Sequence, residues 1–262
     1  MGCMYVIGSV PNLEFDSKPD ISAEELYLLL KMNLSKTDLA PIKVLKRWVD
    51  LANLYKIFEK HDYFDKRGNY PQGMLKEFIE TQQQLPSYVF EYLDEFESDE
   101  DRKKYFAKLI AKYFKEERKK AKGALAEFLK FENEWRILLT AYRAKKSEKS
   151  IAEILKYEDL SDPIVQISIA QSEAPGPFVF PFEYEELEAE LKNAGPNPTS
   201  QMRALAKYRF NYYRDMGVDF PFTLRQIMAY LMQLFQLEDL FALDEIEGKK
   251  QLEKLMENEN AS

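Results

Sequence analysis

Asp50 and Asn53 form the most distinct polar pair in the sequence, because apolar residues surround them in the segment 48–58. Residues three apart lie on the same side of a helix, so the carboxylate and the amide could act together. Acid–base chemistry would need a further acid, base or nucleophile beside them, and the local sequence contains none. We therefore predict a buried structural pair whose polar atoms are hydrogen-bonded.

Two runs of charge follow each other at residues 94–122. The acidic run, 94–101, lacks the alternating ligands and the central glycine of a calcium loop, so we interpret it as the acidic cap of a helix. The basic run, 102–122, carries aromatic residues at helical spacing, which favours core packing over base stacking. Three interpretations of its basic face stay open: a solvated surface, a docking surface for an acidic partner, or a contact with nucleic acid or anionic lipid. Lys112 and Lys115 are the candidate contacts with an acidic partner.

Residues that usually carry metal or nucleophilic chemistry are scarce. His61 is the only histidine and Cys3 the only cysteine, which excludes a two-histidine zinc site, a cysteine cluster and an intrachain disulfide. The sequence also contains no Gly-x-x-x-x-Gly-Lys-Ser/Thr loop, no Gly-x-Gly-x-x-Gly loop and no Gly-x-Ser-x-Gly elbow. We therefore expect no catalytic residue, no metal, no cofactor and no nucleotide hydrolysis in this chain.

The sequence around Asp50 recurs in altered form at residues 134–145. Together the two copies resemble the Asp-x-x-Asn-Leu…Arg-Ala-Lys repeats of the C (or d) subunit of V-type (vacuolar/archaeal-type) ATP synthases. The residues that carry this likeness are Asp50, Asn53, Leu54, Leu138, Arg143, Ala144 and Lys145. Three positions depart from the pattern, since Glu59 replaces its arginine, Glu134 its aspartate and Ile137 its asparagine. The opening segment 5–15 is similar instead to a shorter bacterial family linked with V-type ATPases, so the chain is identified as a divergent, shorter form.

The resemblance implies a non-catalytic subunit of the central stalk of a rotary motor that transports protons or sodium ions. Such a subunit would be a cytoplasmic helical socket that transmits torque, peripheral to the membrane and in contact with it only through the complex. Its partners would be the D and F subunits of the rotor shaft and the membrane ring subunit. Glu134, Arg143 and Lys145 are candidates for helix packing or for the interface with a partner. The alternative is a helical adaptor, or an assembly or regulatory protein, unrelated to rotary ATPases.

Composition narrows the class of protein further. The 262 residues are 45% hydrophobic and 14% aromatic, which is enough for a sizeable core and argues against global disorder. A net charge of −8 argues against nucleic acid as a partner. No apolar run approaches the roughly 20 residues that span a bilayer, and the N-terminus lacks the basic region of a signal peptide. We therefore expect a soluble protein.

The periodicity of the apolar residues predicts an all-α chain, organised as a bundle of degenerate helical repeats. We expect one domain, 1–262, with internal divisions at about 1–96, 97–171 and 172–262. Capping boxes at Ser22 and Thr223 predict helix starts, and Pro41 should break the turn that Ser35 begins.

The remaining expectations concern three segments. The β-forming residues 4–10 predict one short N-terminal strand or an extended arm. Residues 99–146 predict a long helical stretch with Gly123 as its weak point, arranged as a hairpin or a strut. The proline-rich segment 172–182 predicts a loop.

Overall fold

The computed structural model describes the backbone of residues 2–260 and the side chains of residues 2–243. Throughout this described part the regular structure is helical, and no strand occurs in it, so the all-α prediction is confirmed. The chain divides into two compact units, residues 1–39 with 181–262 and residues 40–180. The expectation of one domain with divisions near residues 96 and 171 stays a prediction, and the two units are described in turn.

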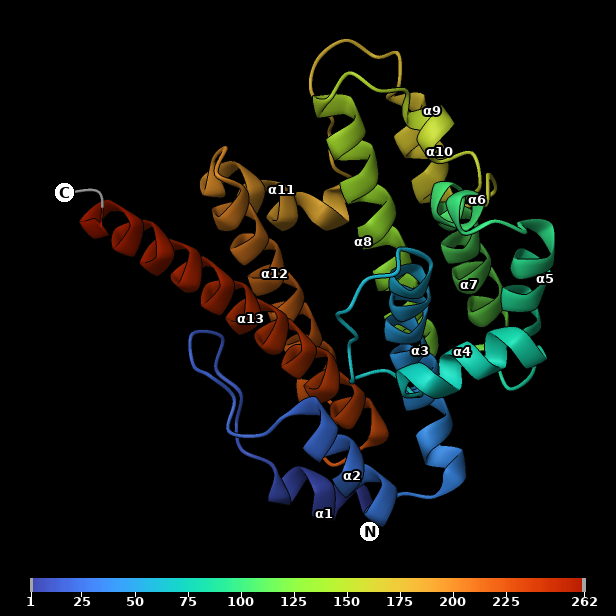
Figure 1. The fold of residues 1–262 in the computed structure, drawn as a ribbon, viewed down its shortest axis with the longest axis vertical. Coiled ribbons are helices and arrows are strands. Elements are labelled where there is room, and N and C mark those ends of the chain that lie inside the picture. The colour runs from blue at the N-terminus through green and yellow to red at the C-terminus, as the bar shows by residue number, and fades with distance from the viewer. Residues whose placement is uncertain (1, 261–262) are drawn as a thin grey trace. The chain divides into compact units, whose positions relative to one another are not determined.

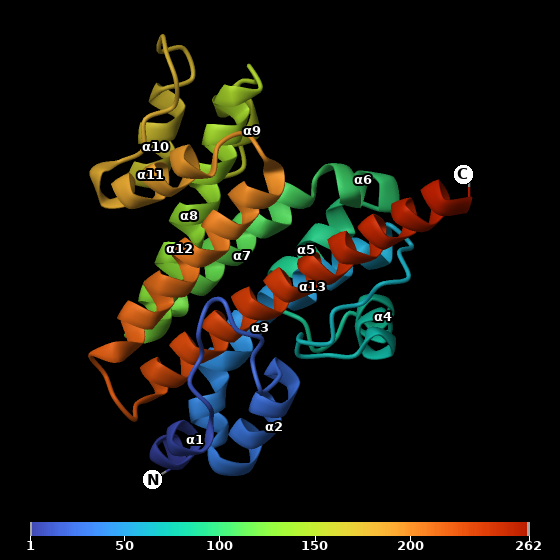
Figure 2. The same cartoon turned by 90° about the vertical axis from the view of Figure 1, so that its left-hand side faces the viewer.

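The first unit is built on a helical hairpin (Figures 1 and 2). Its elements are α1 (Gly2–Ser9), α2 (Ala23–Asn33), η1 (Phe182–Tyr184), α11 (Glu185–Ala194), α12 (Pro198–Val218) and α13 (Leu224–Asn260). The hairpin consists of α12 and α13. Helix α12 packs against α11, and helix α13 packs against α1 and α2. Its core includes Tyr213, Leu231 and Leu234, all fully buried. At the hairpin turn a Cβ on Gly217 would lie 2.8 Å from the Ala229 Cβ, so a glycine is required for this close approach.

The predicted strand or extended arm at residues 4–10 is wrong, because α1 covers most of this segment. Tertiary packing overrides the β-propensity of the residues. Val6 is fully buried, and a Cβ on Gly2 would lie 2.2 Å from the Asn33 carbonyl oxygen, so the start of α1 sits directly on the end of α2. A helix satisfies its own backbone hydrogen bonds at this contact, and an isolated strand would not.

The second unit contains the remaining helices, arranged around α3, α7 and α8 (Figure 2). Its elements are α3 (Lys36–Phe58, whose first turn belongs to the first unit), α4 (Gln72–Thr81), α5 (Ser87–Glu95), α6 (Asp99–Lys104), α7 (Phe106–Lys120), α8 (Ala124–Lys146), α9 (Ile151–Ile154) and α10 (Pro163–Ala170). Helix α7 packs against α5 and α8, and α8 also packs against α9 and α10. Trp48 of α3 meets Tyr113 and Phe114 of α7, with ring centroids 6.2 and 5.7 Å apart. Tyr113 and Phe114 are buried, so these two aromatic residues of the basic run belong to the core, whereas Tyr105 and Phe106 are half-buried.

The capping boxes located two helix starts, since α2 begins after Ser22 and α13 after Thr223. The capping box at Ser22 is formed in full, with the Ser22 hydroxyl accepting from the Glu25 amide. Helix α3, in contrast, continues through Pro41, so the predicted break is wrong. The hydrogen bond that Pro41 cannot donate would have gone to the carbonyl of Thr37, which is exposed near the helix start and can bond to water. The predicted long helix at 99–146 is divided into α6, α7 and α8. Gly123 adopts φ +54° at the turn between α7 and α8, and these two helices pack together as a hairpin, one of the two predicted arrangements.

Candidate functional site

Asp50 is buried within the second unit, where it binds the end of the loop that joins α3 to α4. The side chain is 1% exposed. Its Oδ1 accepts hydrogen bonds from the amides of Asn69 (2.7 Å) and Tyr70 (3.4 Å), and its Oδ2 accepts one from Asn69 Nδ2 (2.6 Å). The other hydrogen of that Asn69 amide goes to the Lys43 carbonyl at 2.9 Å. Asn69 therefore connects the loop to α3 at two points.

Asn53 holds the middle of the same loop. Its Nδ2 donates to the Asp65 carbonyl (2.8 Å), and its Oδ1 accepts from the Asp65 amide (2.9 Å), which mimics the pairing between two backbone segments. Asn53 and the adjacent Leu54 are both fully buried. Asp50 and Asn53 are therefore buried and hydrogen-bonded, as their spacing predicted, but their partners are loop backbone groups, and they do not bond to each other.

The loop fits closely over Asp50. A Cβ on Gly68 would lie 2.5 Å from Asp50 Oδ1, so only glycine allows the backbone to approach the carboxylate this closely. Burial raises the pKa of Asp50 to about 6, and hydrogen bonds from Asn69 and the charge of Lys46 only partly offset this rise. Burial of this carboxylate therefore lowers stability, and its hydrogen bonds hold the loop in one position.

We refer to residues 59–71 as the fixed loop. Behind it lie the side chains of α3, and on its outer surface His61, Asp62, Tyr63 and Lys66 are exposed. The Nδ1 of His61 accepts from the Tyr63 amide (3.0 Å), and the Lys56 ammonium lies 3.8 Å from the centre of the Tyr63 ring. The loop therefore presents an exposed aromatic ring in a defined position.

The three candidates on α8 have different environments. Lys145 donates to the carbonyls of Gln171 (2.8 Å), Ser172 (3.2 Å) and Ala174 (2.6 Å), so it holds the loop that follows α10. Glu134 is mostly buried, 3.8 Å from Lys130 one turn away. Arg143 is exposed in the last turn of α8. Lys145, like Asp50 and Asn53, is therefore a side chain that fixes loop backbone.

Much of the basic face at 102–122 is neutralised within the second unit. Lys112 lies 3.2 Å from Glu91 of α5, and Lys108 pairs with Glu95 of the same helix. Lys115 lies farther from its nearest acid, 3.8 Å from Asp159, and is 51% exposed. Lys115 is therefore more exposed than Lys112, whose charge is partly neutralised by Glu91 of α5.

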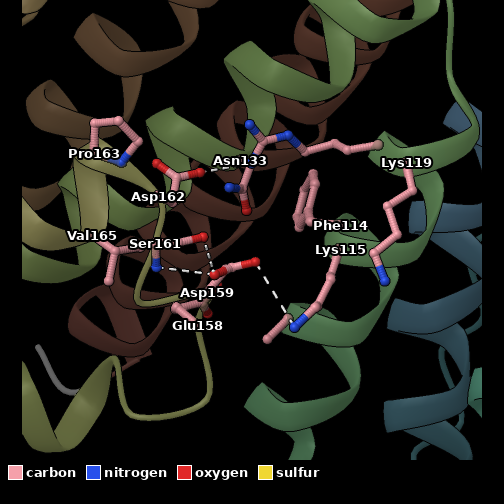
Figure 3. Close-up of a pocket in the computed structure, with 12 residues that line it drawn as sticks. Phe114, Lys115, Lys119, Asn133, Glu158, Asp159, Ser161, Asp162, Pro163 and Val165 are labelled. Atoms are coloured by element: carbon pink, nitrogen blue, oxygen red, sulfur yellow. Dashed lines mark hydrogen bonds and ion pairs between the residues drawn. The ribbon is translucent and has the colours of Figure 1, made fainter.

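A cleft of about 430 Å³ opens beside Lys115 (Figure 3). Lys115, Lys119 and Phe114 of α7 line one side of it, and Asp159, Ser161 and Asp162 line the other. Its volume is in the range of small-ligand sites. Asn133 of α8 also lines the cleft although it is 4% exposed.

The carboxylates around the cleft are already bound by donors of the chain. Arg136 stacks over Phe114 and donates to both oxygens of Glu158, at 2.8 and 2.7 Å. Asp162 caps α10 by accepting from the Ile164 amide (3.0 Å) and also accepts from Arg118 Nη1 (2.8 Å). Asp159 accepts from the hydroxyl and the amide of Ser161, at 2.7 and 3.0 Å, and these hydrogen bonds lower its pKa.

Sequence reasoning missed most of this cleft. Asn133 and Arg136 lie one turn apart on α8, but Glu158 belongs to a segment 22 residues beyond Arg136, and no spacing in the sequence indicates that they meet. One signal was present, since Asp162 followed by Pro163 is typical of a helix start. Among the residues that the structure describes, no group of three or more His, Cys, Asp or Glu side chains could hold a metal ion. Within the same residues, no helix is long and apolar enough to cross a membrane.

Comparison with known proteins places the chain in a family. The family described as "Protein of unknown function (DUF2764)" matches residues 1–260. An uncharacterized protein of Chlamydia trachomatis is 23% identical over 88% of this chain and 90% of its own length. Similar proteins of Chlamydia pneumoniae and Chlamydia muridarum are 27% and 24% identical, over 82% and 84% of this chain and 82% and 85% of their own lengths. No solved structure matches the chain.

These matches correct one prediction. The assignment to the C-subunit family of V-type ATP synthases is wrong, because the family that matches along the chain is a different one. The short phrase around Asp50 that carried the resemblance has a local explanation, since Asp50 and Asn53 bind the fixed loop. Both buried side chains find their hydrogen-bond partners within the chain, so the phrase needs no partner protein to explain it.

Proposed function

We propose that this chain, which belongs to the family described as protein of unknown function (DUF2764), is a helical adaptor that binds a partner protein through the fixed loop and has no catalytic site of its own. The observation that supports this most is the use of two fully buried polar side chains, Asp50 and Asn53, to hold an exposed loop. A buried carboxylate lowers stability, and apolar residues at the same positions would give a more stable core.

Fixing the loop has a direct consequence for binding. A mobile loop must be ordered when a partner binds, and this ordering subtracts from the affinity. The hydrogen bonds to Asp65, Asn69 and Tyr70 order the loop beforehand. Tyr63, which is 56% exposed, then offers a large ring of the kind that often dominates protein interfaces.

Site-specific photo-crosslinking tests this proposal. A photoreactive phenylalanine derivative replaces Tyr63 in the full chain, produced in cells that express it naturally. The matched control carries the same replacement at Tyr5, a tyrosine of α1 that is 60% exposed. We expect a discrete crosslinked protein from position 63 that position 5 does not give. Absence of any adduct at position 63, or the same adducts from both positions, would contradict the proposal.

The role in the central stalk of a V-type ATPase stays a prediction that is separate from family membership. It requires that the partner be the D or F protein of the rotor shaft, or the membrane ring protein, and that the chain be peripheral to the membrane within that complex. Identification of the protein crosslinked at Tyr63 distinguishes this role from that of an adaptor outside rotary ATPases.

A further inference from the structure

Asn133, which lines the cleft beside α7, carries a donor group that the protein does not use (Figure 3). Its Oδ1 accepts from Arg136 Nη2 at 2.8 Å. A guanidinium can only donate, so this contact fixes which end of the Asn133 amide carries the nitrogen. The two hydrogens of Nδ2 reach no acceptor among the described residues, although the side chain is 4% exposed. Buried donors are rarely left without an acceptor, so a ligand of this cleft should place an oxygen here.

The two sides of the cleft carry opposite charges. Lys115, Arg118 and Lys119 of α7 line one side, and Glu158, Asp159 and Asp162 line the other (Figure 3). Three positive and three negative side chains cancel each other in total charge. Because complementary charges favour binding, this lining favours a ligand that carries both signs over a simple anion or a simple cation.

Asp159 and Lys115 are the most loosely paired members of these two rows. The other two carboxylates bind arginine side chains, and Lys119 lies 2.8 Å from Glu116. Hydrogen bonds from the hydroxyl and the amide of Ser161 reach Oδ1 of Asp159 and lower its pKa, so this carboxylate is ionised at neutral pH. Its Oδ2 lies 3.8 Å from Lys115 Nζ, beyond hydrogen-bonding distance, and the two side chains are 43% and 51% exposed. Such exposed pairs contribute little to stability, so a ligand can replace this contact.

A ligand that meets these three groups has a defined chemistry. A carboxylate can accept from Asn133 Nδ2 and also pair with Lys115, and an ammonium group can donate to Asp159 Oδ2. An α-amino acid carries both groups on one carbon atom. The cleft volume of about 430 Å³ is in the range of small-ligand sites, which leaves room for the side chain of such a ligand.

We propose that this cleft binds a free α-amino acid as its zwitterion, with the carboxylate at Asn133 and Lys115 and the ammonium group at Asp159. The inference goes beyond the proposed adaptor function, because it assigns a small-molecule site to the same unit. It does not depend on the fixed loop, whose residues lie outside the cleft lining.

The test uses the purified full chain with isotopically labelled nitrogen and each of the standard L-amino acids in turn. Binding is followed through the side-chain amide signals of Asn133 in NMR spectra and by isothermal titration calorimetry. We expect at least one amino acid to bind and to shift the Asn133 signals. Its N-acetyl derivative lacks the positive charge and its carboxamide lacks the negative charge, so each should bind about tenfold more weakly or worse.

Two substitutions of unchanged size test the contacts. Asn133→Asp keeps the acceptor for Arg136 and replaces only the donor, and Asp159→Asn keeps the oxygen to which Ser161 donates. Each should weaken binding of that amino acid about tenfold or more. Asp159 is partly exposed, so its variant should fold even if the change at Asn133 disturbs the core. The matched control, Asn193→Asp at an exposed asparagine of α11, should change the affinity by no more than about twofold.

Several results would overturn the proposal. Unchanged Asn133 signals with every amino acid would leave only water at this amide. Equal binding of the N-acetyl derivative would indicate an anion site, and equal binding of the carboxamide would indicate a cation site. Equal affinities of the natural chain and of both cleft variants would place the ligand elsewhere. None of these results depends on crosslinking at Tyr63, so the cleft and the fixed loop can fail separately.

Discussion

Replacement of Asp50 by asparagine should change how the stability of the protein depends on pH. The folded protein raises the pKa of Asp50 from an ordinary 3.8 to about 6, so the folded state binds this proton more tightly than the unfolded state. A raised carboxyl pKa makes stability highest at low pH, and that stability is lost as the pH rises from 3.8 to about 6. One pKa unit corresponds to about 1.4 kcal/mol, so the loss amounts to about 3 kcal/mol.

The variant should not show this loss, because an amide does not ionise. Its oxygen can keep the bonds from the Asn69 and Tyr70 amides, but its new Nδ2 would face Asn69 Nδ2. A rotated Asn69 amide can accept from it, since Asn69 Oδ1 has no partner among the described residues. This rotation breaks the hydrogen bond to the Lys43 carbonyl and lowers the free energy of unfolding by about 1 kcal/mol at every pH.

Urea unfolding of both proteins between about pH 3.5 and 7.5 measures the effect. The variant should gain about 3 kcal/mol relative to the natural chain as the pH rises, whatever the offset at low pH. Asp65→Asn is a control of opposite sign. Burial raises the pKa of Asp65, but hydrogen bonds and attraction from Arg67 outweigh it and lower the pKa, so stability from Asp65 is lost as the pH falls. A constant difference between the natural chain and Asp50→Asn, or one that favours the natural chain at higher pH, would refute the reasoning.

Two further substitutions test how the fixed loop is held. Asn53→Ala leaves the amide and the carbonyl of Asp65 without their partner and should lower the free energy of unfolding by about 1–3 kcal/mol, with faster hydrogen exchange at the Asp65 amide; unchanged exchange would show that Asn53 does not hold the loop. Gly68→Ala places a Cβ 2.5 Å from Asp50 Oδ1 and should destabilise the protein by about 1–3 kcal/mol in thermal or urea unfolding. Gly73→Ala in α4, where a Cβ meets nothing within 4 Å, should instead be neutral or slightly stabilising, and equal costs at the two glycines would contradict the close fit.

Features that depend on neighbours in the sequence were predictable. The helix starts predicted at Ser22 and Thr223 match the starts of α2 and α13, because capping residues act within a few residues of the chain. The burial of Asp50 and Asn53 followed from their apolar surroundings in the same way. Local hydrogen bonds and one-turn periodicity determine these features, and both can be read from a single segment.

Features that depend on distant residues were not predictable. Asn69 lies 19 residues beyond Asp50, and nothing in its spacing indicates that it meets the carboxylate. The carbonyls that Lys145 binds lie 26 to 29 residues away, so nothing in the Arg-Ala-Lys phrase indicated which loop this side chain would hold. The strand predicted at 4–10 failed for the same reason, because the contact of Gly2 with Asn33 decided its form.

Affinity capture shows whether the chain is an adaptor that acts through its fixed loop. The natural chain, Tyr63→Ala and the matched variant Tyr5→Ala are each captured at native level from mild-detergent lysates, and the recovered proteins are quantified by mass spectrometry. We expect a partner that is recovered with the natural chain and with Tyr5→Ala and is depleted about tenfold or more with Tyr63→Ala, since an aromatic anchor contributes about 1.4 kcal/mol or more. Recovery of the same partners in equal amounts by all three proteins would contradict it.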